Sequence, residues 1–259
     1  MKGAKSIRTS LLAALALALT APGLAADAPA AQSRLGKGYL EPAALPDSLA
    51  LLPPPPAAGS AAEARDREAA GAAVAQRGTP RWQLATRDAD LFSAGATGAF
   101  SCAAGVAIGP QTTPRLDALL RKTLPDLGLA SYAAKTRYQR TRPFVVNGEA
   151  NCTPEASAML AKDGSYPSGH AAIGFGWGLI LAELLPGRAT QVTARGREFA
   201  DSRRVCNVHW LSDVEAGQVV AAATVARLHA EPAFRKDMDA ARKELRRARA
   251  APPTGCGGN

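Results

Sequence analysis

Metal-binding and membrane-spanning patterns are missing from most of this chain. Its 259 residues include only four cysteines, which form no CxxC pair and no Cys/His cluster, so we expect no metal site and no cofactor. Beyond the first thirty residues, no apolar run is long enough to cross a bilayer. No segment shows the alternation of apolar and polar residues that indicates a half-buried strand. We therefore predict a mostly α-helical protein without a membrane span.

The first thirty residues have the pattern of a secretory signal peptide. They combine a basic start, an apolar centre over 11–20 and small residues suited to cleavage. The apolar stretch is too short for a permanent anchor. We predict a signal peptide over 1–25, cleavage near 25–28, and a mature protein that is periplasmic or secreted.

The cysteines are even in number and widely spaced, at Cys102, Cys152, Cys206 and Cys256. In an oxidising compartment this predicts one or two disulfides, with three possible connectivities if all four pair. We favour a bridge between Cys152 and Cys206, because each lies close in sequence to a motif described below. Free buried thiols are the alternative.

The formal net charge is +9, which suits anionic partners such as nucleic acid. Much of the basic charge lies in 235–249, where Lys and Arg alternate with Asp237, Asp239 and Glu244. That mixture is typical of a solvated helix face. We therefore expect no nucleic-acid partner.

Composition divides the mature chain into an arm, one domain and a tail. Four consecutive prolines at 53–56 predict an extended arm over 26–60, because proline is excluded from helix interiors and central strands. Residues 61–250 are expected to form a compact all-α domain, and 251–259 a flexible tail unless Cys256 ties it down. The expected helices span residues 61–76, 82–92, 114–123, 127–138, 154–160, 171–185, 189–200 and 215–230.

Histidine and a carboxylate occur four residues apart at His209 and Asp213. If the segment from His209 is helical, Asp213 lies one turn away and can accept the Nδ1 proton, which leaves Nε2 nucleophilic. Arg203 can reach the same substrate only if the helix breaks near 206–207. A surface pair or a capped core histidine is the alternative reading.

Two further groups of residues predict an anion site. Lys135 and Arg142 are two helical turns apart and share a face if their helix runs up to Pro143, although a solvated basic strip is the alternative. Ser168 and Gly169 begin an apolar helix whose free N–H groups suit an anion. An ordinary cap by Ser168 is the alternative there.

Together these groups meet the requirements of phosphomonoester hydrolysis without a metal. Fixed cations and backbone donors stabilise the phosphoryl oxygens in the transition state. One histidine attacks phosphorus, while a protonated second one, His170, donates to the leaving alcohol. A bell-shaped pH profile with an acidic to near-neutral optimum is expected. His229 has no supporting motif and is predicted to be structural.

Three motifs carry a family resemblance, and they read Lys135-x6-Arg142-Pro143, Pro167-Ser168-Gly169-His170 and Ser202-Arg203-x5-His209-x3-Asp213. This order resembles the signature of the phosphatidic acid phosphatase type 2 and vanadium haloperoxidase superfamily. Tyr166 and the proline arm further resemble class A bacterial non-specific acid phosphatases, and the likeness covers roughly 39–240.

The resemblance implies an all-α acid phosphatase that acts on nucleotides and on sugar or aryl phosphates, with phosphate or vanadate as inhibitors. It implies His209 as nucleophile, Asp213 as its orienting partner and His170 as general acid. It also implies that family members are often oligomeric and that some transfer phosphate to alcohols. The phosphate ligands that it implies are Lys135, Arg142, Ser168, Gly169 and Arg203.

Three other functions fit the same sequence features. A nucleotide or lipid diphosphohydrolase and a vanadate-dependent haloperoxidase could use the same scaffold. A basic envelope protein that binds an anion without turnover is a third possibility.

Overall fold

The computed structural model describes Met1, residues 35–248, Pro253 and Cys256. The predicted signal peptide at 1–25 lies outside the described residues apart from Met1, as does most of the predicted tail. Within the described ranges, no helix is long and apolar enough to cross a membrane.

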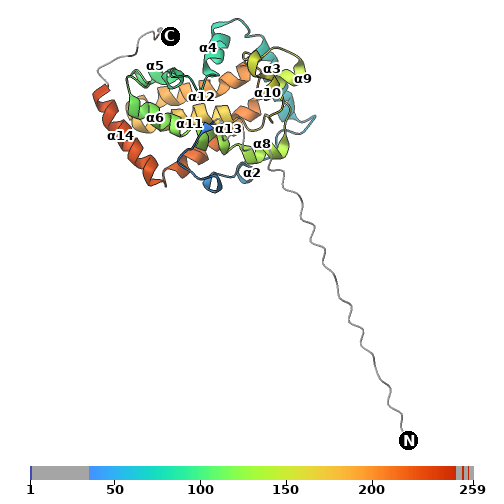
Figure 1. Cartoon of the computed structure of the whole chain (residues 1–259). Coiled ribbons are helices and arrows are strands. Elements are labelled where there is room, and N and C mark those ends of the chain that lie inside the picture. The colour runs from blue at the N-terminus through green and yellow to red at the C-terminus, as the bar shows by residue number, and fades with distance from the viewer. Residues whose placement is uncertain (2–34, 249–252, 254–255, 257–259) are drawn as a thin grey trace.

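Every regular element in residues 35–248 is helical, which confirms the all-α prediction (Figure 1). The 3-10 helices are η1 (Pro42–Ala44), η2 (Ala96–Phe100), η3 (Pro154–Ala156) and η4 (Pro186–Arg188). The α-helices are α2 (Ser48–Leu51), α3 (Ala61–Val74), α4 (Pro80–Asp88), α5 (Ser101–Ala104), α6 (Pro114–Lys122), α7 (Leu124–Leu129), α8 (Tyr132–Tyr138), α9 (Pro143–Asn147), α10 (Ser157–Leu160), α11 (Gly169–Leu184), α12 (Ala189–Val205), α13 (Leu211–Leu228) and α14 (Pro232–Ala248).

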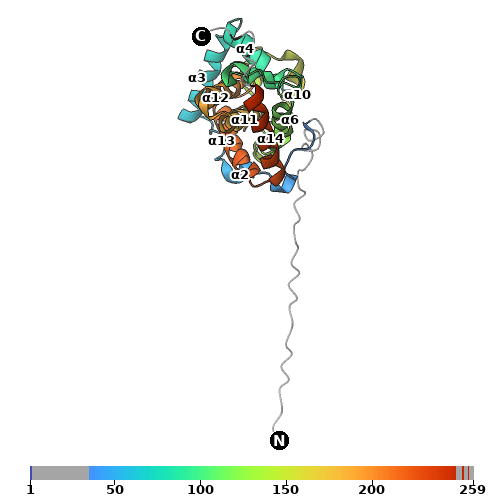
Figure 2. The same ribbon diagram turned by 90° about the vertical axis from the view of Figure 1, so that its left-hand side faces the viewer.

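Helix α11 forms the centre of the fold. It is apolar on all sides, so it can be stable only when other helices surround it. It packs against α12, α13 and α7, and Figure 2 shows it near the middle of the molecule. Its glycines permit a close crossing with α12, because a Cβ at Gly178 would lie 3.1 Å from Cα of Gly196. This close packing fixes the N-terminus of α11 relative to the end of α12.

Helix α14 closes one side of the core. Its apolar residues Phe234, Met238, Ala241 and Leu245 recur at helical spacing and are all buried. They face the core beside α6, and Figure 2 shows α14 alongside it. Burial of each large side chain contributes about 1.5–3 kcal/mol to folding. The described basic residues of 235–249 therefore lie on the same helix as these buried apolar residues.

Most of the expected helices are present, although α4 ends at Asp88 and the expected helix 154–160 is divided between η3 and α10. The expected helix 127–138 is divided into α7 and α8, and α8 ends because Gln139 adopts a left-handed conformation with φ of 43°. The arm is not wholly extended, because η1 and α2 form short turns before the prolines at 53–56.

Two disulfides join the cysteines. Cys152 pairs with Cys206, as predicted, and Cys102 pairs with Cys256. The first bridge connects the loop after α9 to the end of α12, where the Cys152 N–H also donates to the Cys206 carbonyl at 3.3 Å. The second bridge ties Cys256 to α5.

Candidate active site

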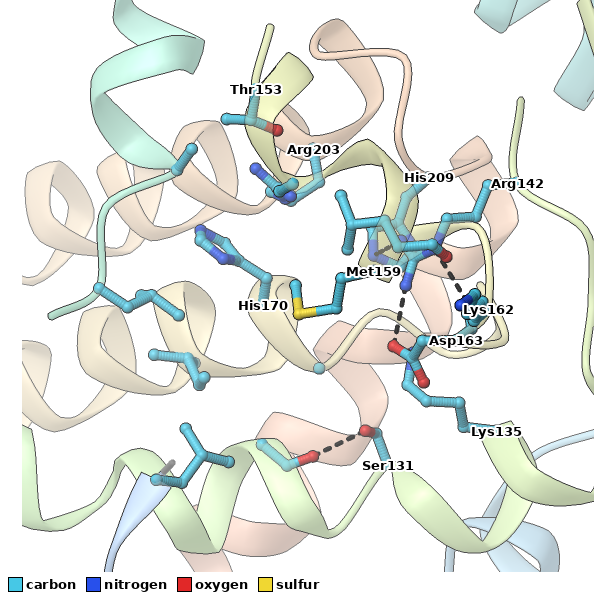
Figure 3. Close-up of a pocket in the computed structure, with 18 of the residues that line it drawn as sticks. Ser131, Lys135, Arg142, Thr153, Met159, Lys162, Asp163, His170, Arg203 and His209 are labelled. Carbon is cyan, nitrogen blue, oxygen red and sulfur yellow. Dashed lines mark hydrogen bonds and ion pairs between the residues drawn. The ribbon is translucent and has the colours of Figure 1, made fainter. Parts of the chain in front are cut away.

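The three sequence motifs meet at one cavity of about 760 Å³ (Figure 3). Its lining comes from α4 and the residues that follow it, from α7, α8, η3, α10 and α11, from the end of α12, and from loop residues that include Arg142 and His209. The predicted site residues in this lining are Lys135, Arg142, Gly169, His170, Arg203 and His209. Ser168 and Asp213 are completely buried behind it.

A sharp turn brings Arg203 and His209 to the same cavity. Helix α12 ends at Val205, and Asn207 adopts a positive φ of 59°. The Arg203 carbonyl then accepts hydrogen bonds from the N–H groups of Val208 and His209, both at 3.2 Å. The break expected near 206–207 is therefore present. The segment is not helical from His209, because α13 begins only at Leu211, although Asp213 still lies close to the ring.

The two ring nitrogens of His209 have different neighbours. Arg142 Nη1 lies 3.0 Å from Nε2, and since a guanidinium can only donate, Nε2 must carry a lone pair. The proton of the neutral ring is then on Nδ1, which lies 3.4 Å from Asp213 Oδ2. Burial, followed by the charges of Arg142, Lys135 and Arg203, lowers the pKa of His209 well below its usual value. The ring is therefore neutral, with Nε2 as the basic atom.

Asp213 is held by several donors. Its Oδ2 accepts hydrogen bonds from Ser165 Oγ at 2.5 Å and the Trp210 N–H at 2.8 Å, and its Oδ1 accepts from Arg140 Nη1 at 2.6 Å. These bonds fix the carboxylate beside His209. Sequence reasoning missed Arg140 and Ser165, because only folding brings these two segments to Asp213.

Lys135 and Arg142 converge differently from the expectation. They do not share a helical face, because α8 ends at Tyr138 and Arg142 is the extended residue before α9. Both are buried, and both contact Asp163, whose Oδ2 lies 3.0 Å from Arg142 Nη2 and 3.4 Å from Lys135 Nζ. The solvated basic strip is thus ruled out for these two residues.

The buried cations are incompletely compensated. Burial is the main cause that lowers the pKa of Lys135 to about 8 and that of Arg203 to about 9. Arg203 Nε and Nη1 are buried and have no hydrogen-bond partner within the described part of the chain. An unpaired buried donor is costly, so an anion in the cavity would be bound strongly.

The N-terminus of α11 approaches the cavity through Gly169. Ser168 caps the helix, since its hydroxyl accepts from the Ala171 N–H at 3.2 Å. Gly169 is closely packed, because a Cβ there would lie 3.0 Å from Ser131 Oγ and 3.2 Å from the Gly128 carbonyl oxygen. The ordinary cap is therefore present, and ligation of an anion by this helix end stays a prediction.

His170 is oriented by the backbone of α4. Its Nε2 lies 2.7 Å from the Asp88 carbonyl, which can only accept, so Nε2 carries a proton. The ring stacks on Phe199 at 5.3 Å. Burial, followed by the charge of Arg203, lowers its pKa well below the usual value. The lowered pKa favours the neutral ring of His170 near neutral pH, and in that form the lone pair is on Nδ1.

Asp88 was not identified from the sequence. Its Oδ2 accepts a hydrogen bond from Ser202 Oγ at 2.6 Å, and its Oδ1 pairs with Arg195. Asp88 therefore holds α4 and α12 together behind His170 and Arg203. His229, predicted to be structural, pairs with Glu183 at 3.0 Å outside the cavity.

No group of three or more His, Cys, Asp or Glu side chains is placed to hold a metal ion in the ranges that the structure describes. The charged residues that line the cavity are the cations Lys135, Arg142, Lys162 and Arg203 and the carboxylates Asp90, Glu155 and Asp163.

Comparison with known proteins gives consistent matches. Residues 123–235 match the model of the PAP2 superfamily. An acid phosphatase of Zymomonas mobilis is 42% identical over 212 residues, covering 80% of this chain and 79% of that protein. A non-specific acid phosphatase of Providencia stuartii is 41% identical over 208 residues, covering 80% and 84%. A non-specific acid phosphatase of Salmonella typhimurium is 43% identical over 195 residues, covering 75% and 78%.

Proposed function

The chain belongs to the PAP2 superfamily and is an acid phosphatase. On this basis we propose that it is an exported enzyme that hydrolyses a broad range of phosphomonoesters. The proposed reaction passes through a phosphohistidine on His209. The observation that carries this proposal is the contact between Arg142 Nη1 and His209 Nε2 at 3.0 Å. It leaves a lone pair on the nitrogen that faces the three cations. A neutral imidazole in this tautomer is the form that can attack phosphorus.

The first step transfers the phosphoryl group to the protein. His209 Nε2 attacks phosphorus, and the bond from phosphorus to the leaving oxygen breaks. Asp213 stabilises the positive charge that develops on the ring, because it faces Nδ1. Lys135, Arg142 and Arg203 stabilise the phosphoryl oxygens and supply the positive charge that a metal ion provides in other phosphatases.

His170 donates the proton that the leaving alcohol requires. Since its ring is neutral in the free protein, it must gain a proton when substrate binds. A phosphate dianion beside the ring favours the charged imidazolium and raises its pKa. After the alcohol leaves, His170 takes a proton from water, which attacks the phosphohistidine and releases phosphate.

The proposed location is the periplasm. The basic and apolar pattern of the first thirty residues supports export. The two disulfides also favour an oxidising compartment. Periplasmic fractionation of cells that express the full chain tests this part of the proposal, and a cytoplasmic mature protein would contradict it.

The decisive experiment is hydrolysis of p-nitrophenyl phosphate from pH 4 to 8 with EDTA present. Wild type and His229→Ala should retain turnover, whereas His209→Ala should lose it, because only His209 bears the nucleophilic nitrogen. Acid quenching should trap an acid-labile phosphoryl label on wild type and none on His209→Ala. Turnover that depends on added metal, or that persists in His209→Ala, would reject the mechanism.

A further inference from the structure

One acidic side chain lies among the cations of the candidate active site. Asp163 Oδ2 is 3.0 Å from Arg142 Nη2 and 3.4 Å from Lys135 Nζ. Figure 3 shows the carboxylate between these two side chains, inside the cavity. An anion thus already occupies donors that a phosphoryl group would need.

Asp163 and its two partners differ in their access to water. The side chains of Arg142 and Lys135 are 2% and 5% exposed, whereas that of Asp163 is 35% exposed. Arg142 is further fixed because its Nε donates to two carbonyls and its Nη1 to that of Val208. The carboxylate is therefore the partner that can turn toward solvent while the cations stay in place.

The three cations also differ in how many of their nitrogen atoms already have a hydrogen-bond or ion-pair partner. Every nitrogen of the Arg142 guanidinium has a partner, and Lys135 Nζ donates to the Gly164 carbonyl at 2.5 Å as well as facing Asp163. In contrast, Nε and Nη1 of Arg203 have no partner in the described part of the chain. An entering anion can bind Arg203 directly, but it must replace Asp163 at the other two cations.

We propose that Asp163 is an internal counter-anion that competes with the substrate phosphoryl group for Lys135 and Arg142 and that turns outward when substrate binds. The inference rests on the proposed function only in identifying the substrate anion. In the free protein the carboxylate neutralises part of the buried positive charge, which limits the cost of holding three cations in one cavity. The same contact lowers the affinity for every anion that binds there.

The test is calorimetric titration with inorganic phosphate, which measures binding without turnover. Asp163→Asn keeps the size of the side chain and removes its charge. We expect it to bind phosphate roughly tenfold more tightly than wild type, because the competitor is gone. Vanadate should gain by a similar factor, since both anions displace the same carboxylate. With substrate, KM should fall while kcat does not rise.

Glu155→Gln is the matched control. Glu155 is exposed, lines the same cavity and makes no ion pair with the two cations in the described residues. Glu155→Gln changes the net charge by the same amount as Asp163→Asn. If it changes phosphate affinity by less than twofold, the gain in Asp163→Asn comes from the lost contact with the cations and not from net charge. Asp163→Ser is a second variant, to be used if the amide disturbs folding.

The results separate two roles of Asp163. Tighter phosphate binding in Asp163→Asn supports competition, whereas unchanged or weaker binding shows that the carboxylate positions the cations and overturns the inference. An equal gain in Glu155→Gln would also overturn it. Failure of the proposed function is distinguishable, because it appears as absent turnover in wild type and does not depend on the comparison of affinities.

Discussion

Arg142 donates from Nη1 to Nε2 of His209 across 3.0 Å, although the two residues are 67 positions apart in the chain. The contact has two consequences. It fixes the tautomer of the imidazole, and it covers the lone pair until a substrate engages the guanidinium. The same arginine is thus expected to protect the nucleophile in the free protein and to bind the phosphoryl group during reaction.

Replacing Arg142 with lysine tests the tautomer. Lysine keeps the charge but not the planar fork that reaches both His209 and the neighbouring carbonyls. We expect kcat to fall about a hundredfold and the ring protons of His209 to redistribute between the two nitrogens, as measured by ¹⁵N NMR. The control Arg203→Lys should weaken phosphate binding without changing the tautomer. An unchanged Nδ1–H tautomer in Arg142→Lys would contradict this role.

Replacing Asp213 with asparagine should reduce both activity and stability. An amide turns one acceptor into a donor opposite Arg140, Ser165 or the Trp210 N–H, and it leaves Arg140 without one of its counter-ions. We expect unfolding free energy to fall by about 3–5 kcal/mol and turnover to be largely lost. Chemical denaturation and p-nitrophenyl phosphate hydrolysis measure the two effects.

The matched control for this change is Asp66→Asn. Asp66 also pairs with Arg140, at 2.7 Å, and is buried, but it has no contact with His209 among the described residues. It should lose stability while each folded molecule keeps most of its turnover. Equal loss of turnover per folded molecule in the two variants would show that Asp213 acts only through the fold.

Lys135→Met should stabilise the protein while it weakens phosphate binding. Burial lowers the pKa of Lys135 to about 8 from 10.5, so the unfavourable burial of its charge is fully present below pH 8. We expect the variant to gain about 1–3 kcal/mol at pH 7, because a lowered pKa means that the charged lysine is destabilised in the folded state. The gain should shrink as pH rises from 8 toward 10.5, because the lysine of the folded wild type then loses its charge. Thermal unfolding across this pH range measures it, and a destabilised variant at pH 7 would contradict the expectation.

Phosphate binding should be accompanied by proton uptake at His170. Its pKa is well below 6.5 in the free protein, so the ring is neutral at pH 6.5, and a bound dianion raises that pKa. Calorimetry in buffers of different ionisation enthalpy should show more proton uptake in wild type than in His170→Asn. Equal uptake in the two proteins would remove His170 from the role of general acid in the bound state.

Local patterns predicted the helices that are amphipathic or uniformly apolar. Helix α11 was expected from its unbroken apolar composition, and the turn after α12 from the need to bring Arg203 toward His209. The condition under which Lys135 and Arg142 would share a helical face is not met, because Gln139 leaves the helix with a positive φ, which residue spacing does not reveal. A left-handed residue other than glycine depends on surroundings that a local pattern does not contain.

The sequence by itself determined the all-α class, the family and which residue types are present for phosphoryl transfer, because these depend on composition and on spacing within short segments. Tertiary structure alone decided what each group can do. It placed Arg142 on His209 Nε2, Asp88 behind His170, and Asp163 between two cations. These contacts join segments far apart in the chain, and hydrogen-bond direction and burial, which set tautomer and charge, exist only once the segments are packed together.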